Sequence, residues 1–88
     1  MGKMARLSDL RGIGPSTETM LHRADITSVE TLRELGPIEA YVRLRFVNEH
    51  VSINALYALA AGLEGRDWRS LSDAERQALR AELPEGLV

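Results

Sequence analysis

The architecture of this chain is set by six residues, Leu10-Arg11-Gly12-Ile13-Gly14-Pro15. Glycine adopts backbone angles that are closed to other residues, so the chain can turn sharply at Gly12 and Gly14. Pro15 suits the first position of a helix, where its fixed φ and its missing N–H do no harm. We therefore expect one helix to end here and another to begin, with the side chain of Ile13 facing the core.

Helical signals dominate the rest of the chain, and no sustained alternation predicts a strand. Prolines, glycines and N-cap residues divide the sequence into segments, and we expect helices at about 5–10, 15–24, 28–35, 37–47, 53–63 and 73–83. The alanines of the segment 53–63 allow close packing, which makes it the likeliest central helix. The expected fold class is all-α, a compact bundle of five to six short helices.

Two further local patterns refine this expectation. Thr27 with Glu30, and Ser72 with Glu75, have the spacing of capping boxes. Residues 10–15 are also repeated in part farther along the chain, as Leu32-Arg33-Glu34-Leu35-Gly36-Pro37. This second copy again predicts a helix end, a turn and a helix that starts at proline. The sequence thus predicts two consecutive helical hairpins.

Size and composition indicate one small domain without catalytic chemistry. The chain has 88 residues, and a domain of this size buries only about 60% of the surface that its unfolded chain exposes, which leaves little to line a deep pocket. We expect residues 1–88 to form a single domain with a frayed tail at 85–88. His22 and His50 lack matched ligand or nucleophile partners, so no catalytic residue, metal site or cofactor is expected.

The absence of cysteine and the balance of charges indicate the cellular environment of the protein and the kinds of partner it can bind. Cysteine is absent, the N-terminus does not read as a secretory signal, and the longest apolar stretch is about half of a membrane-spanning helix. These features predict a cytoplasmic protein that does not bind a membrane. Eleven Lys and Arg against thirteen Asp and Glu give a net charge of −2, without the basic excess of an electrostatic nucleic-acid footprint. Any binding to phosphate must be local or weak.

Residues 10–15, which we call the hairpin, are followed by Leu21 and by residues 26–32, and together they resemble a helix-hairpin-helix motif. In DNA-binding members of that superfamily, the hairpin grips the duplex backbone without reading its sequence. Free amides at the start of a helix can hold a phosphate oxygen. The resemblance implies DNA-backbone contacts from the following candidates: Gly12, Ile13, Gly14, Thr17 and Arg11.

Three positions depart from the pattern of such DNA binders. Ser16 stands where Lys or Arg usually follows Gly-Pro, and Glu18 would repel a phosphate. Asp25 replaces the glycine that normally closes the second helix. Three readings of the hairpin therefore stay open: a tight structural corner, a phosphate or DNA contact, and a docking point for a protein partner.

Three sequence stretches farther along the chain indicate a particular protein family more specifically than the hairpin does. Residues 35–41 (Leu-Gly-Pro-Ile-Glu-Ala-Tyr), 54–59 (Asn-Ala-Leu-Tyr-Ala-Leu) and 68–71 (Trp-Arg-Ser-Leu) make the chain similar to the C-terminal domain of the TfoX/Sxy competence-regulator family, over about 7–83. Family members commonly read Gly-Ala where this chain has Ala61-Gly62. The resemblance implies a helix-hairpin-helix or SAM-like core, a link to regulation of DNA uptake, and no catalytic residues.

Two hypotheses of function follow. The first is a non-catalytic interaction module that acts through an unidentified protein partner, and the alternative is weak, sequence-independent binding of the DNA backbone through the hairpin. We expect Trp68 to pin its loop onto the helices, with a partner-facing role as the alternative. A homodimer that hides surplus apolar surface also stays open.

Overall fold

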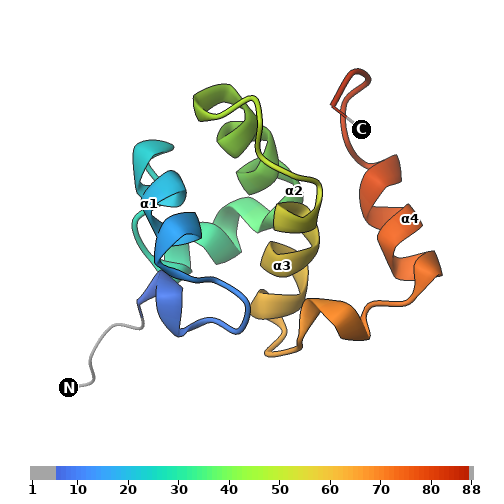
Figure 1. The fold of residues 1–88 in the computed structure, drawn as a ribbon, viewed down its shortest axis with the longest axis horizontal. Coiled ribbons are helices and arrows are strands. Elements are labelled where there is room, and N and C mark those ends of the chain that lie inside the picture. Colours follow the sequence, from blue (N-terminus) through green and yellow to red (C-terminus); the bar gives the residue numbers. More distant parts are fainter. Residues whose placement is uncertain (1–5, 88) are drawn as a thin grey trace.

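The computed structural model describes residues 6–87, and its regular elements are all helical. Figure 1 shows α1, α2 and α3 gathered together, with α4 at the far side of α3. The all-α class is therefore confirmed. In chain order the elements are the 3-10 helix η1 (Leu7–Asp9), α1 (Pro15–Arg23), α2 (Val29–Val47), α3 (Asn54–Leu63), the 3-10 helix η2 (Trp68–Ser70) and α4 (Asp73–Ala81).

Fewer separate helices are found than the sequence predicts, because two of the expected segments are joined end to end across a kink. The described residues contain four α-helices and not the expected five to six. The segments expected at 28–35 and 37–47 join into α2, which kinks at Gly36, where φ is 81°. Gly36 is non-helical, with a ψ of 165°, and Pro37 begins a second helical stretch directly after it, as the sequence predicts. The second copy of the repeat thus ends one helical stretch and starts another at Pro37, as predicted, but as a kink within α2 and not as a second hairpin.

The first expected helix, at 5–10, is also shorter than the sequence suggests. Ala5 lies outside the described residues, and the rest forms only the single turn η1. The amide of Leu10 donates to the carbonyl of Leu7 over 3.0 Å, and Leu10 itself has extended backbone angles. The chain thus leaves the helical region directly into the hairpin.

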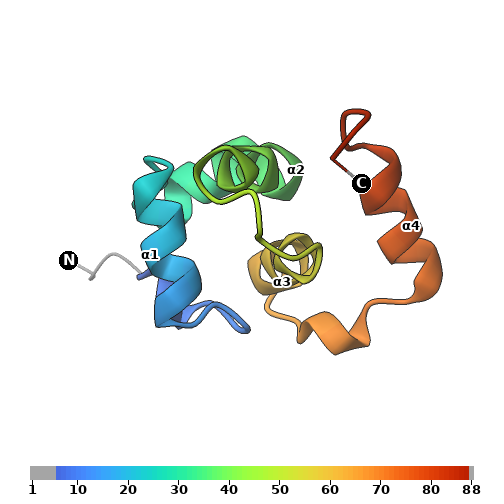
Figure 2. The same ribbon diagram turned by 45° about the horizontal axis from the view of Figure 1, so that its top comes forward.

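α3 is the central helix, as its alanines suggest. Its Leu56 and Leu59 are fully buried. Figure 2 shows α3 between α2 and the segment that leads to α4. Ile13 is 3% exposed, so its expected inward direction is confirmed. The buried apolar residues form one core: Leu7, Ile13, Leu21, Ile26, Val29, Leu32, Ala40, Tyr41, Leu44, Val51, Leu56, Tyr57, Leu59, Ala61, Leu71 and Leu83.

Side-chain caps explain where two of the helices begin. Ser72 and Glu75 form the expected capping box, with the Ser72 amide donating to the Glu75 carboxylate over 2.8 Å and the Glu75 amide donating to the Ser72 hydroxyl over 3.1 Å. The box expected from Thr27 and Glu30 is wrong. α2 begins one residue later, with Ser28 as its N-cap, because the hydroxyl of Ser28 accepts an amide of the first turn.

Left-handed residues close two of the helices. Asp25 follows α1 with a φ of 64°, which confirms that this position calls for the conformation that glycine favours. Gly65 closes α3 with a φ of 71°, and the amide of Arg66 donates to the carbonyl of Ala61 over 2.8 Å. Gly62 lies inside α3 and is buried there. It is the point where the hairpin packs against this helix.

Candidate functional site

The two glycines of the hairpin have different roles. Gly12 has a φ of 83°, so it needs the left-handed freedom of glycine, and its α-carbon faces Ala58 and Trp68. Gly14 has a φ of −91° and a ψ of −178°, an extended conformation that any residue adopts. The expectation that the turn needs special backbone angles at both glycines is confirmed for Gly12 and wrong for Gly14.

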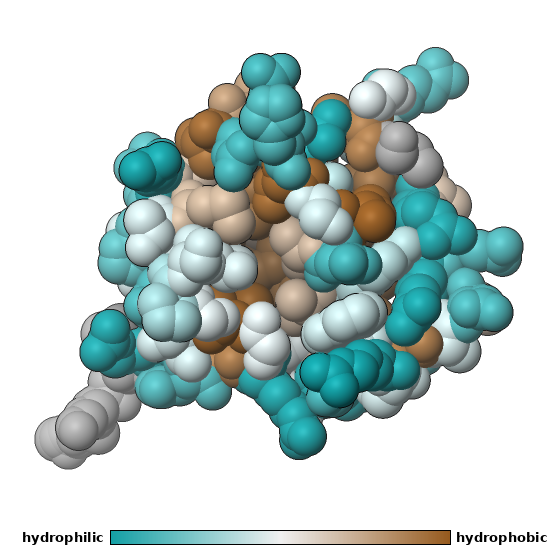
Figure 3. Space-filling view, in the orientation of Figure 1, coloured by the Kyte–Doolittle hydropathy of each residue, from teal (hydrophilic) through white to brown (hydrophobic). Residues whose placement is uncertain are grey.

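Gly12 of the hairpin lies in the lining of a groove of about 440 Å³. In Figure 3 this face of the molecule is hollowed between α1 and α3, with apolar residues on its floor and hydrophilic ones around it. The groove brings together three of the residues that the sequence singled out, Gly12, Thr17 and Trp68. Its full lining is Gly12, Ser16, Thr17, Met20, Asn48, His50, Val51, Ser52, Asn54, Ala55, Ala58 and Trp68.

The rim of the groove is polar and its lining contains no carboxylate. Hydroxyl, amide and imidazole groups offer both donors and acceptors, which come from Ser16, Thr17, Asn48, His50, Ser52 and Asn54. Asn48 is held in place, because its side-chain nitrogen lies 3.3 Å from the sulfur of Met20 and its oxygen accepts the amide of His50 over 3.0 Å. The groove is therefore suited to a neutral polar ligand with an apolar part.

Glu18 does not line this groove. One of its carboxylate oxygens accepts the amide of Ser8 over 3.2 Å, and the other lies 3.5 Å from the guanidinium of Arg6. Its side chain is only 15% exposed. The carboxylate of Glu18, which was expected to repel a phosphate at the hairpin, thus faces η1, where Arg6 partly neutralises its charge.

The other hairpin candidates are divided between the core and the surface. The side chain of Ile13 is in the core, and its amide already donates to the carbonyl of Leu10 over 3.1 Å. Arg11 is exposed and lies outside the lining of the groove. Within residues 6–87, no protein acceptor receives the amides of Gly12 and Gly14. These two amides are therefore among the backbone donors that remain for a ligand.

Trp68 packs against the core and also faces the groove. The guanidinium of Arg76 lies 5.8 Å from the centre of its ring, and that of Arg69 lies 5.9 Å away. Because Trp68 also lies against Gly12, one side chain links the hairpin, its own loop and α4. This is the anchoring role that the sequence suggested, and the remaining ring surface is available to a ligand.

Two cationic side chains of α4 contact aromatic residues of the rest of the domain. Arg76 and Arg80 are half-buried, whereas Ala78 on the same helix is exposed. Arg76 lies 5.5 Å from the ring centre of Tyr57, and Arg80 donates to the hydroxyl of the same tyrosine. α4 has no fully buried residue, so these cationic contacts supplement the apolar packing of its Leu79 against the core.

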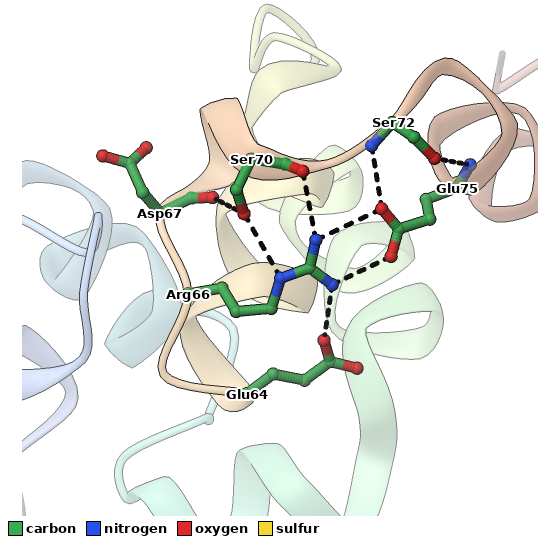
Figure 4. A network of polar contacts seen from close by, with 6 residues as sticks. All are labelled: Glu64, Arg66, Asp67, Ser70, Ser72 and Glu75. Carbon is green, nitrogen blue, oxygen red and sulfur yellow. Dashed lines mark hydrogen bonds and ion pairs between the residues drawn. The ribbon is translucent and has the colours of Figure 1, made fainter.

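A second cationic contact fastens the start of α4 (Figure 4). Arg66 donates to both carboxylate oxygens of Glu75, over 2.8 and 3.2 Å, and to Glu64 over 3.1 Å. It also donates to the carbonyl of Ser70 over 3.1 Å. The hydrogen bond from Arg66, aided by the Ser72 amide, lowers the pKa of Glu75 from 4.5 to about 2. The sequence showed only the capping role of Glu75.

The described part of the chain contains neither a candidate metal site nor a candidate membrane-spanning helix. Residues 6–87 contain no group of three or more His, Asp or Glu side chains that could hold a metal ion. No helix among them is long and apolar enough to cross a membrane.

Comparison with known proteins extends over nearly the whole chain. Residues 3–83 match the family described as the TfoX C-terminal domain. The DNA transformation protein TfoX of Haemophilus influenzae is 31% identical over 83 residues, which make up 94% of this chain and 38% of that protein. This chain therefore spans well under half of the length of that relative.

Two solved structures from Listeria monocytogenes share the fold. An uncharacterized protein in a triclinic crystal form is 33% identical, with a TM-score of 0.81 over 86% of each chain. A protein of unknown function in a tetragonal form is 32% identical, with a TM-score of 0.80 over 85% of this chain and 93% of that chain. The arrangement of helices described above thus recurs in experimentally determined relatives.

Proposed function

Because this chain belongs to the TfoX C-terminal domain family, we propose that it is a non-catalytic interaction module of competence regulation that binds a protein partner. The groove beside the hairpin carries the proposal. It combines an apolar floor with a neutral polar rim, while the chain as a whole has a net charge of −2. A surface of this kind suits a protein ligand better than a polyanion.

The chemistry of the groove indicates what part of a partner it binds. Asn48 and Asn54 each offer a donor and an acceptor, as a peptide backbone requires. Met20 and Trp68 provide adaptable and aromatic surface for an apolar side chain. We therefore propose that the groove takes an extended peptide segment with one apolar anchor, its backbone facing the asparagines.

The test is a selection of peptides from a random library on the purified domain. Ala55 lines the groove, so Ala55→Gln fills it without changing the charge, and we expect at least a tenfold loss of affinity for the selected peptides. Gln77 is exposed on α4 and is not among the residues that line the groove, so Gln77→Ala serves as the control and should bind as the wild type does. Peptides that bind both variants equally, or a selection that yields none, would contradict the proposal.

A second candidate function is weak binding of the DNA backbone through a helix-hairpin-helix-like core. It is favoured by the amides of Gly12 and Gly14, which no protein group accepts within residues 6–87, and by the turning away of Glu18. In this arrangement the Thr17 hydroxyl and Arg11 add contacts to the same phosphate strand. With about three phosphate contacts the salt slope is only about −3.

An NMR titration with a short DNA duplex at low salt tests this second function. Shifts confined to residues 11–18 would support it. No shift, or shifts spread evenly over the cationic surface, would leave peptide binding as the function of the groove.

A further inference from the structure

The single phenylalanine of the chain lies on the surface. Phe46 is 85% exposed on the last turn of α2, and the neighbouring Val47 is 40% exposed. Isolated apolar residues on a surface are common. Phe46, however, does not stand alone, because a hollow of about 120 Å³ opens beside it and is lined by Val42, Arg45, Phe46 and Leu87. We call these four residues the Phe46 surface.

The Phe46 surface joins two elements that are far apart in the sequence. Val42, Arg45 and Phe46 come from α2, whereas Leu87 comes from the turn that follows α4. This turn is closed by a hydrogen bond from the amide of Leu87 to the carbonyl of Pro84 over 3.2 Å. The described part of the tail is thus folded beside the hollow, and an exposed aromatic side chain and a recess lie side by side.

The two elements that form the Phe46 surface carry exposed or partly exposed charges of opposite sign. Arg45 stands on the α2 edge, and Glu85 belongs to the turn that carries Leu87. Among the described residues neither side chain takes part in an ion pair. A partner that fits this surface must present a protruding apolar group, a recess and the same two charges in the reverse order. A copy of the same surface, turned by a two-fold rotation, has all of these features.

We propose that the Phe46 surface is the contact of a two-fold homodimer, in which each Phe46 enters the hollow of the other copy and each Arg45 faces the other Glu85. The surface shares no residue with the groove beside the hairpin, so the proposal does not depend on what that groove binds. Its small size implies a weak, reversible dimer.

Sedimentation of the whole chain over a range of concentrations up to about 1 mM tests the association. We expect the apparent mass to rise from 9.8 kDa toward twice that value. Phe46→Glu should weaken the association at least tenfold, and it should fold normally because the side chain it replaces is almost fully exposed. His22→Glu, an exposed position on α1, is the control and should dimerise as the wild type does.

A charge exchange separates this two-fold contact from any other self-association. Arg45→Glu and Glu85→Arg should each weaken the dimer several-fold, and the double variant should regain most of the affinity, because both pairs across the two-fold axis are restored with reversed signs. A wild type that stays monomeric at the highest concentration would overturn the proposal. So would a dimer that is insensitive to Phe46→Glu, or a double variant no better than the single ones.

Discussion

The carbonyl oxygen of Arg11 lies only 2.8 Å from the position that a Cβ atom of Gly62 would occupy. The backbone of the hairpin is thus in direct contact with the backbone of α3, and the absence of a side chain at Gly62 makes this contact possible. Leu10 and Ile13 complete the contact on either side of the same glycine.

Gly62→Ala is therefore expected to destabilise the domain, although alanine is the better helix former. The added methyl group meets a backbone atom, which cannot rotate away, and overpacking of this kind costs about 1–3 kcal/mol. The gain in helix propensity of up to about 1 kcal/mol offsets only part of this cost. Urea unfolding gives the difference, and a variant as stable as the wild type would contradict the close packing.

The second prediction separates the two glycines of the hairpin. Gly12 is in the left-handed region, so Gly12→Ala should lower the free energy of unfolding by about 1–2 kcal/mol. Gly14 is extended and a Cβ there would meet nothing within 4 Å, so Gly14→Ala should change it by less than about 0.5 kcal/mol. Thermal unfolding of the two variants measures the contrast. Equal losses would mean that the turn depends on both glycines.

The hairpin and the kink show which features a sequence can predict. A glycine followed by proline indicates a change of direction, and both Gly14-Pro15 and Gly36-Pro37 do mark one. In the second copy Glu34 stands at the position of Gly12, so Gly36 is the one glycine that can take the positive φ, whereas the first copy has two glycines and it is Gly12 that takes it. That choice depends on how the flanking segments pack, and α3 lies against the first copy alone at Gly62.

The contacts of α4 and the groove were beyond the reach of the sequence. From the sequence, Arg76 and Arg80 are expected to face solvent, because arginine is rarely buried. Their inward position is favourable because they contact the aromatic residues Tyr57 and Trp68, which belong to other elements. The groove draws its lining from α1, the loop before α3, α3 itself and η2. No single segment carries a signal for such a composite surface.

A third prediction concerns how the stability of the domain changes at acidic pH. Arg66 holds the pKa of Glu75 at about 2 in the folded protein, below its ordinary value of 4.5. A carboxylate with a lowered pKa adds stability above its unfolded-state pKa, and this contribution is lost as the pH falls from about 4.5 toward 2. Urea unfolding between pH 6 and 2 should show the wild type losing more stability in this window than Glu75→Gln does. Parallel pH profiles for the two proteins would contradict the pairing.

The fourth prediction uses Trp68, the single tryptophan of the chain, as a reporter of α4. Removing the guanidinium of Arg76 with Arg76→Ala should cost about 1 kcal/mol and shift the tryptophan emission to longer wavelength, since the ring loses its cover. Arg69 lies at a similar distance from the ring but is exposed, so Arg69→Ala is the matched control with a smaller effect. Identical emission from both variants would show that α4 does not depend on Arg76.

The fifth prediction decides whether the hairpin touches DNA. Ser16 follows Pro15 directly and is exposed at the start of α1, where DNA-binding hairpins carry a cation, so Ser16→Lys should add one phosphate contact. If the hairpin lies on the DNA backbone, this variant binds a duplex more tightly at low salt, and its salt slope steepens by about 0.9. Thr19→Lys adds the same charge at another exposed position of α1 that does not line the groove, and it should have a smaller effect. Equal gains from the two lysines would mean that only net charge matters, and that the amides of Gly12 and Gly14 hold no phosphate.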